Sequence, residues 1–81
     1  MDNNEKLKEI FSEVLDIELQ EINDSLSPKN CGKWDSVKNL LLLSEIESTF
    51  DVSLEFEDMN AMTDFGKVKE GLKKYGVTDL W

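Results

Sequence analysis

The chain has 81 residues, with 18 Asp or Glu, nine Lys and neither Arg nor His, so its net charge at pH 7 is −9. A chain of this length builds one small domain. We therefore expect residues 1–81 to form a single unit, with a core within about 5–75 and a tail over 76–81. The charge argues against a nucleic-acid binder, which needs a basic surface, and favours partners with basic surfaces.

Several further classes of protein are excluded by what the sequence lacks. Its longest apolar run, Leu40 to Leu43, is far shorter than the roughly 20 residues that span a membrane. The polar start of the chain is not a signal peptide. Cys31 is the only cysteine, so neither an internal disulfide nor a cysteine-based metal site is expected. Because there is no His, a Ser-His nucleophilic site is excluded, and we expect a cytoplasmic protein that is not an enzyme.

The first predicted element is an amphipathic helix over about residues 4–16. Apolar side chains at positions 7, 10, 11 and 14 fall on one face of such a helix. Asn3 or Asn4 can serve as its N-cap, and Glu5 and Glu9 suit its positive N-terminal end.

Residues 17–35 are predicted to form a long connection. Pro28 and Gly32 are turn residues that make one continuous helix unlikely to form. Leu19, Ile22 and Leu26 are spaced so that the connection can pack onto the core, and a turn of helix fits near residues 19–24. The loop is therefore expected to be ordered.

Trp34 ends this connection and has two interpretations. The simpler one is a buried anchor that closes the loop, because an indole ring buries a large apolar area. The alternative is that its ring borders a binding partner or a bound group.

A second helix is predicted from Ser36 to about Phe50–Asp51, with Asp35 or Ser36 as its N-cap. Apolar residues recur at steps of three and four, which indicates a buried stripe along one side of this helix. Leu42 and Leu43 widen that stripe. The residues assigned to that stripe are Val37, Leu40, Leu41, Ile46 and Phe50. Among the leucines, Leu42 is expected to stay partly exposed near a docking face.

The rest of the chain is predicted to form an extended segment over 51–56, a short helical turn over 57–62 and a final helix. Met59 and Met62 should point inward from the turn. Thr63 or Asp64 caps the final helix, and Gly76 ends it. Its apolar stripe consists of Phe65, Val68, Leu72 and Tyr75. The predicted fold is thus all-α: a small four-helix bundle with three longer helices, one short helix and a long ordered loop between the first two.

The sequence resembles the acyl carrier protein family over about residues 5–75. The likeness rests on the length, the helical order, the long first loop and three groups of residues. These groups are Trp34-Asp35-Ser36, then Leu40, Leu43, Ile46, Glu47 and Phe50, and then Glu57-Asp58-Met59 followed by Met62-Thr63-Asp64-Phe65. Val37 stands where the family usually has Leu after the serine, and Lys38 adds positive charge to a helix that is usually acidic in members of fatty acid synthesis.

This resemblance implies that Ser36 carries a 4'-phosphopantetheine arm taken from coenzyme A, with Asp35 supporting the site. It implies a monomeric carrier of acyl or aminoacyl thioesters. Its partners would be a phosphopantetheinyl transferase, an acyl-activating ligase and acyl-transferring or condensing enzymes with basic surfaces. Trp34 and Lys38 favour a specialised pathway over housekeeping fatty acid synthesis.

Partner docking is assigned to a face on the second helix and the short turn after it. The docking candidates are Val37, Leu42, Glu45, Glu47, Glu57 and Asp58. The residues alone leave other interpretations open. Asp and Ser are also the common N-cap residues, and exposed acids are common on protein surfaces. The alternative function is a small acidic interaction module without a prosthetic group.

Overall fold

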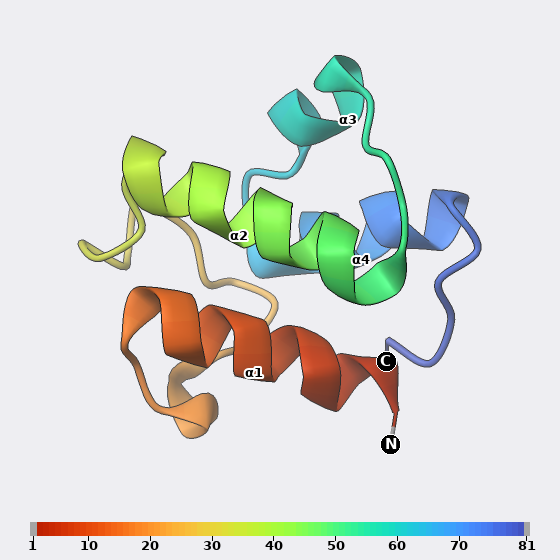
Figure 1. Ribbon diagram of the computed structural model, residues 1–81. Coiled ribbons are helices and arrows are strands. Elements are labelled where there is room, and N and C mark those ends of the chain that lie inside the picture. The colour runs from red at the N-terminus through yellow and green to blue at the C-terminus, as the bar shows by residue number, and fades with distance from the viewer. Residues whose placement is uncertain (1, 81) are drawn as a thin grey trace.

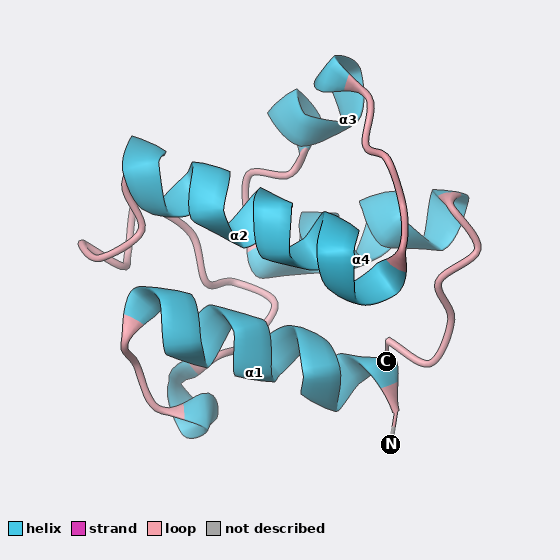
Figure 2. Cartoon of the chain, in the orientation of Figure 1, coloured by secondary structure: helices cyan, strands magenta, loops and turns pink. Residues whose placement is uncertain are grey.

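The computed structural model describes residues 2–80, and it is all-helical over that range (Figures 1 and 2). The elements in chain order are α1 (Asn3–Leu15), a 3-10 turn η1 (Leu19–Glu21), α2 (Ser36–Phe50), α3 (Phe56–Ala61) and α4 (Phe65–Lys74). The predicted set of three longer helices and one short helix is confirmed. The turn predicted near 19–24 is the shorter η1.

The core lies between α1, α2 and α4. Helix α1 packs along α2, and the short α3 packs on α4 (Figure 1). Phe11 of α1 is fully buried and contacts two other rings edge to face, Trp34 at 5.2 Å and Phe65 at 5.0 Å between ring centroids. Edge-to-face aromatic pairs stabilise a core beyond the effect of the apolar area that they bury. This cluster therefore ties the end of the long loop to α1 and α4.

The loop over residues 17–35 is ordered and anchored, as predicted. Ile22 and Leu26 are buried, whereas Leu19 is half exposed and is not one of the anchors. Backbone bonds tie the loop to the start of α4: the Phe65 N–H donates to the Leu26 carbonyl at 2.9 Å. The ammonium of Lys69, itself buried, forms an ion pair with Asp24 at 2.6 Å.

The N-cap of α1 is Asp2 rather than Asn3 or Asn4. The Asp2 carboxylate accepts the Glu5 N–H at 2.8 Å. The two asparagine side chains instead donate to carbonyls of the C-terminal segment, Asn3 to Thr78 at 2.7 Å and Asn4 to Leu80. A capping prediction from the sequence cannot see an acceptor that lies more than 70 residues away.

The segment after α4 is part of the core and not a tail. Val77 and Leu80 are buried, and Leu80 is fully inaccessible. Gly76 has a φ of +86°, the left-handed conformation that glycine adopts without strain, and it turns the chain back toward α1. The core predicted for residues 5–75 therefore extends to Leu80; Trp81 lies outside the described residues.

The predicted buried stripe of α2 is confirmed at Ile46 and Phe50 and wrong at Val37, Leu40 and Leu41. Leu42, Leu43 and Ile46 face the core, and Leu42 is 1% exposed. Val37, Leu40 and Leu41 are exposed instead. Leu42 therefore cannot be a surface docking residue. Its burial follows from the α1 contact, which uses the face that carries Leu42, Leu43 and Ile46.

Candidate functional site

Ser36 is the first residue of α2, and it is exposed. Asp35 is the N-cap: its backbone is extended, and its Oδ1 accepts the Lys38 N–H at 2.9 Å. The Asp35 carbonyl also accepts the Asn39 N–H at 2.8 Å. These two bonds define the start of the helix, so the Ser36 hydroxyl is presented from a well-ordered turn.

The buried side chain of Trp34 stabilises this turn. Its side chain is 2% exposed, so the interpretation as a buried anchor is confirmed. The indole N–H donates to the Asn39 side-chain oxygen at 3.0 Å, which satisfies the polar atom of the buried ring. This bond links Trp34, which precedes Ser36, to Asn39 in the first turn of α2.

Ser36 is one of the residues that line a shallow groove of about 800 Å³. The groove is also lined by the loop at Ser27–Lys29, by Trp34, by Met59 and by the residues that join α3 to α4. The second interpretation of Trp34, that its ring borders a binding partner or a bound group, stays a prediction. An extended group attached to Ser36 would have room along the groove.

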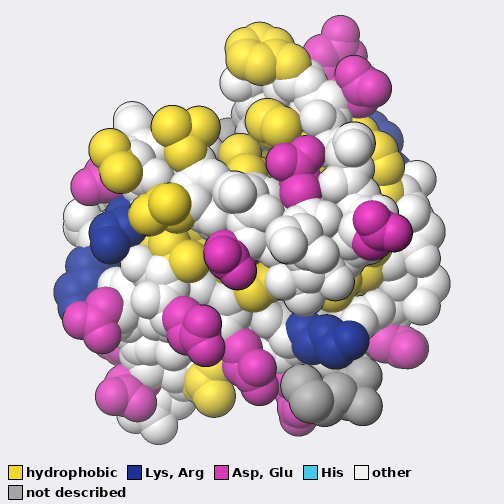
Figure 3. Space-filling model, viewed as in Figure 1, with side chains coloured by type: hydrophobic (Ala, Val, Ile, Leu, Met, Phe, Trp, Pro, Cys, Tyr) yellow, Lys and Arg dark blue, Asp and Glu magenta, His cyan; other side chains and the backbone are white. Residues whose placement is uncertain are grey.

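Apolar side chains are exposed beside Ser36. Leu40 is 69% exposed, and Val37 and Leu41 are also largely accessible; Phe56 of α3 is 74% exposed. Figure 3 shows hydrophobic side chains gathered over α2 and on α3. No acid occurs between Val37 and Ser44, so the first two turns of α2 present an apolar surface.

The four predicted docking acids have different environments. Glu45 and Glu57 are exposed. Glu47 accepts the Leu54 N–H at 2.9 Å and thereby holds the segment after α2. Asp58 accepts a hydrogen bond from the Tyr75 hydroxyl and forms an ion pair with Lys74 at 2.9 Å. Among these four acids, Glu47 and Asp58 form hydrogen bonds or ion pairs within residues 2–80, whereas Glu45 and Glu57 do not.

The bonds of Asp58 also affect its protonation. The hydrogen bond from Tyr75, followed by that from Lys74, holds the pKa of Asp58 below its ordinary value. The same carboxylate raises the pKa of the Tyr75 hydroxyl and that of the Lys74 ammonium. Asp58 is therefore ionised at neutral pH, while both of its partners keep their protons.

The described residues offer neither a metal site nor a membrane-spanning helix. Within residues 2–80 no cluster of Cys, Asp or Glu has the arrangement of a metal site. None of the helices in that range is both long and apolar enough to cross a membrane.

Sequence reasoning missed two features of this region. It placed Leu40 and Leu41 in the core, and it gave no role to Tyr75 beyond a core stripe. A usable signal did exist for α2: four leucines in succession cannot all face one side of a helix.

Comparison with known proteins agrees with this geometry. A search of curated protein sequences gave no match. Residues 5–70 match the family model described as phosphopantetheine attachment site. This match covers most of the chain and includes Ser36, most of α1, and all of α2 and α3. The chain therefore belongs to the phosphopantetheine attachment site family, whose members are carrier domains with a covalently attached 4'-phosphopantetheine group.

Proposed function

We propose that Ser36 is the attachment point of the 4'-phosphopantetheine group and that the protein carries acyl or aminoacyl intermediates on it. The observation that supports this most directly is the position of Ser36. It is an exposed hydroxyl on the first residue of a capped helix, it lies inside the matched range, and it lines a groove.

The surroundings of Ser36 fit such a group. A phosphodiester at this position would lie at the N-terminus of α2, where the backbone N–H groups and the helix dipole favour negative charge. No acidic residue occupies the first turn of α2 after the cap. The groove offers an apolar wall at Trp34 and Met59 for the arm.

In the attachment step the Ser36 oxygen attacks the phosphorus of coenzyme A that bears the pantetheine chain. The new Ser36 O–P bond replaces the bond to the nucleotide part, which leaves as a phosphate, and the serine proton passes to a base of the transferase. Asp35 contributes by holding the helix start that presents the hydroxyl. Once bound, the arm supplies a thiol that holds cargo as a thioester. The protein itself performs no catalytic step.

We also propose a specialised pathway rather than housekeeping fatty acid synthesis. The support is the surface of α2 next to Ser36, where Lys38 and the exposed Val37, Leu40 and Leu41 stand without acids. A partner that docks through basic residues would meet no carboxylate between Ser36 and Ser44.

Partner docking is proposed on the exposed part of the predicted face. Val37 lies next to Ser36, and Glu45 and Glu57 offer exposed carboxylates farther away. Glu47 and Asp58 are proposed to lie at the edge of this docking face, because both already form hydrogen bonds within the chain. The partners would be a phosphopantetheinyl transferase, an acyl-activating ligase and acyl-transferring or condensing enzymes. We propose that residues 1–81 act as one monomeric domain in the cytoplasm.

The test is the intact mass of the purified protein after incubation with coenzyme A and a broadly acting phosphopantetheinyl transferase. The wild type should gain the mass of one phosphopantetheine group, and Ser36→Ala should gain none. Asp35→Ala and Asp2→Ala form a matched pair, since both remove an N-cap carboxylate. Each should lower stability by about 1 kcal/mol, but only Asp35→Ala should slow the modification.

Failure of the wild type to gain mass with several transferases would contradict the proposal. It would instead favour an acidic interaction module that has no prosthetic group. Modification of the Ser36→Ala variant would show that the arm is attached elsewhere.

A further inference from the structure

Two buried side chains form the floor of the groove at Ser36. Among the described residues that line this groove, Trp34 and Met62 are 2% and 4% exposed, and both belong to the hydrophobic core. The other lining residues are exposed or partly exposed. A group that passes from the groove into the core therefore has to displace Trp34 or Met62.

Trp34 closes the part of the floor that faces α1. Its ring contacts Phe11 edge to face at 5.2 Å between centroids, and Phe11 contacts Phe65 at 5.0 Å on its other side. Because protein interiors are close-packed, the indole cannot swing inward without displacing Phe11. Such a movement would also break the bond from the indole N–H to Asn39 and leave a buried donor without its partner, which is unfavourable.

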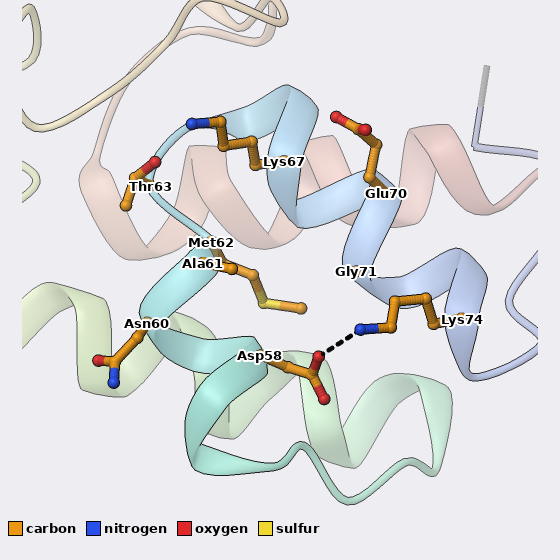
Figure 4. Close-up of a pocket in the computed structure, with 9 residues that line it drawn as sticks. All are labelled: Asp58, Asn60, Ala61, Met62, Thr63, Lys67, Glu70, Gly71 and Lys74. Atoms are coloured by element: carbon orange, nitrogen blue, oxygen red, sulfur yellow. Dashed lines mark hydrogen bonds and ion pairs between the residues drawn. The ribbon is translucent and has the colours of Figure 1, made fainter.

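Met62 closes the part of the floor that faces α4. Its side chain points toward α4 at Gly71 (Figure 4). A Cβ atom at position 71 would overlap the Met62 methyl group, so Met62 fills the space that Gly71 leaves open. Methionine is the more adaptable of the two floor residues, and the hydrogen-bonded indole of Trp34 is the more rigid one.

The side chains around this floor are mostly polar. Hydrogen-bonding groups line the groove at Lys29, Asn39, Asn60, Thr63 and Lys67. An alkyl chain in this shallow groove would keep much of its surface in water and would gain little of the free energy of apolar burial. A short polar group would instead find hydrogen-bonding partners there.

We propose that Trp34 acts as a size filter, which keeps the cargo of an arm at Ser36 in the groove and out of the core. The carrier is then suited to short polar acyl groups, such as aminoacyl groups, and not to long alkyl chains. This inference rests on the proposed function and narrows the class of its cargo. Its direct consequence is that removal of the indole opens a path from the groove to the core.

The test compares the wild type with two variants of the same aromatic cluster. Trp34→Leu removes a ring that lies between the groove and the core. Phe11→Leu is the matched control, because Phe11 is equally buried but lies behind Trp34 and does not line the groove. Both substitutions create space in the core, and only the first connects that space to Ser36. Trp34→Phe is a milder second variant that keeps a ring at this position.

Each protein is loaded by a phosphopantetheinyl transferase with the coenzyme A thioester of acetate or of decanoate, and intact mass confirms loading. In the wild type and in Phe11→Leu, the acetyl and decanoyl forms should have the same thermal unfolding midpoint. The amide NMR signals of Ile46 and Phe65, both in the core, should also be the same in the two forms. In Trp34→Leu, the decanoyl form should unfold at least about 4 °C above the acetyl form, because the chain fills the vacated space.

Two results with the loaded proteins would overturn the size filter. One is a wild type whose midpoint rises, and whose core amide signals move, when decanoyl replaces acetyl. This result requires only the wild type and therefore does not depend on whether a variant folds. The other is the same midpoint for the acetyl and decanoyl forms in both Trp34 variants, since the indole would then not decide where the chain lies.

The floor is also tested on the unmodified proteins, without any arm. Free decanoate should shift the Ile46 and Phe65 amide signals in Trp34→Leu, and should leave them in place in the wild type and in Phe11→Leu. Equal shifts in all three proteins would contradict a floor closed by Trp34. If no arm can be attached to Ser36, the proposed function fails, and the decanoate titration still decides whether Trp34 closes the core.

Discussion

At the scale of single residues, Gly71 has a packing role that its position would not suggest. A glycine inside a helix usually lowers stability by about 1 kcal/mol relative to alanine. In α4 this cost is offset because a side chain at position 71 would overlap Met62. Gly66 makes a similar but looser approach, since a Cβ there would meet Asp24 at 3.3 Å.

Gly71→Ala should stabilise the protein less in the wild type than in a Met62→Ala background. Alanine gains about 1 kcal/mol over glycine inside a helix, but in the wild type the flexible methyl end of Met62 must move aside for the new Cβ atom. In the Met62→Ala background no such movement is needed. Urea denaturation of the four variants in this cycle gives the free energies. Equal gains in the two backgrounds would contradict the contact.

At the scale of elements, α2 shows how a helix can be recognised while its orientation is not. Successive residues of a helix differ by about 100° in direction, so Leu40 to Leu43 point to almost every side. The run of leucines by itself therefore does not show which of them face the core. The structure selects Leu42 and Leu43, and leaves Leu40 and Leu41 on the surface beside Ser36.

Two substitutions of the same kind test this assignment. Leu42→Ala should lower the free energy of unfolding by about 2–5 kcal/mol, because it creates a cavity in the core. Leu40→Ala should change it by no more than about 0.5 kcal/mol, because that side chain is mostly exposed. Thermal or urea unfolding measures both. Equal losses in the two variants would mean that α2 is rotated relative to the described orientation.

At the scale of the whole molecule, the two ends of the chain are joined. The Asn4 N–H donates to the Asp79 carbonyl at 2.9 Å, and the Asn3 side chain donates to that of Thr78. Leu80 is fully buried, and its carbonyl accepts a hydrogen bond from the Asn4 side chain near the start of α1. Figure 1 shows the C-terminal segment running back to the start of α1. A domain of this size has a small core, so one leucine supplied by the last few residues matters.

Leu80→Ala should destabilise the whole protein by about 2–5 kcal/mol, with unfolding still observed as a single transition. Thr78→Ala is the control, because only the backbone carbonyl of Thr78 takes part in the described bond. It should leave the unfolding midpoint nearly unchanged. A Leu80→Ala variant as stable as the wild type would show that the C-terminal segment does not belong to the core.

Most of the fold could be predicted from the sequence, because its signals are local. Asp35 and Asp64 are N-caps, and Gly76 ends the last helical region in a left-handed conformation. The period of apolar residues located α1 and α4, whose buried faces are well separated from their polar faces. The position of Ser36 at an exposed helix start follows from the same capping signal.

Long-range contacts account for what could not be predicted. Asn3 and Asn4 resemble caps until the C-terminal segment offers their side chains acceptors. Asp58 resembles a surface acid until Tyr75, on another helix, bonds to it. In each case the partner is far away in sequence, and no local pattern indicates it.

The sequence by itself determined the helical class, the order of the helices and the candidate serine, because hydrophobic period and capping depend on neighbouring residues. Only the tertiary structure decided which leucines of α2 are exposed, that the chain is closed from Asn3 to Leu80, and that α3 is held over the groove by Asp58, Lys74 and Tyr75. These outcomes depend on which surfaces meet when the helices pack, and that is set by the whole chain at once.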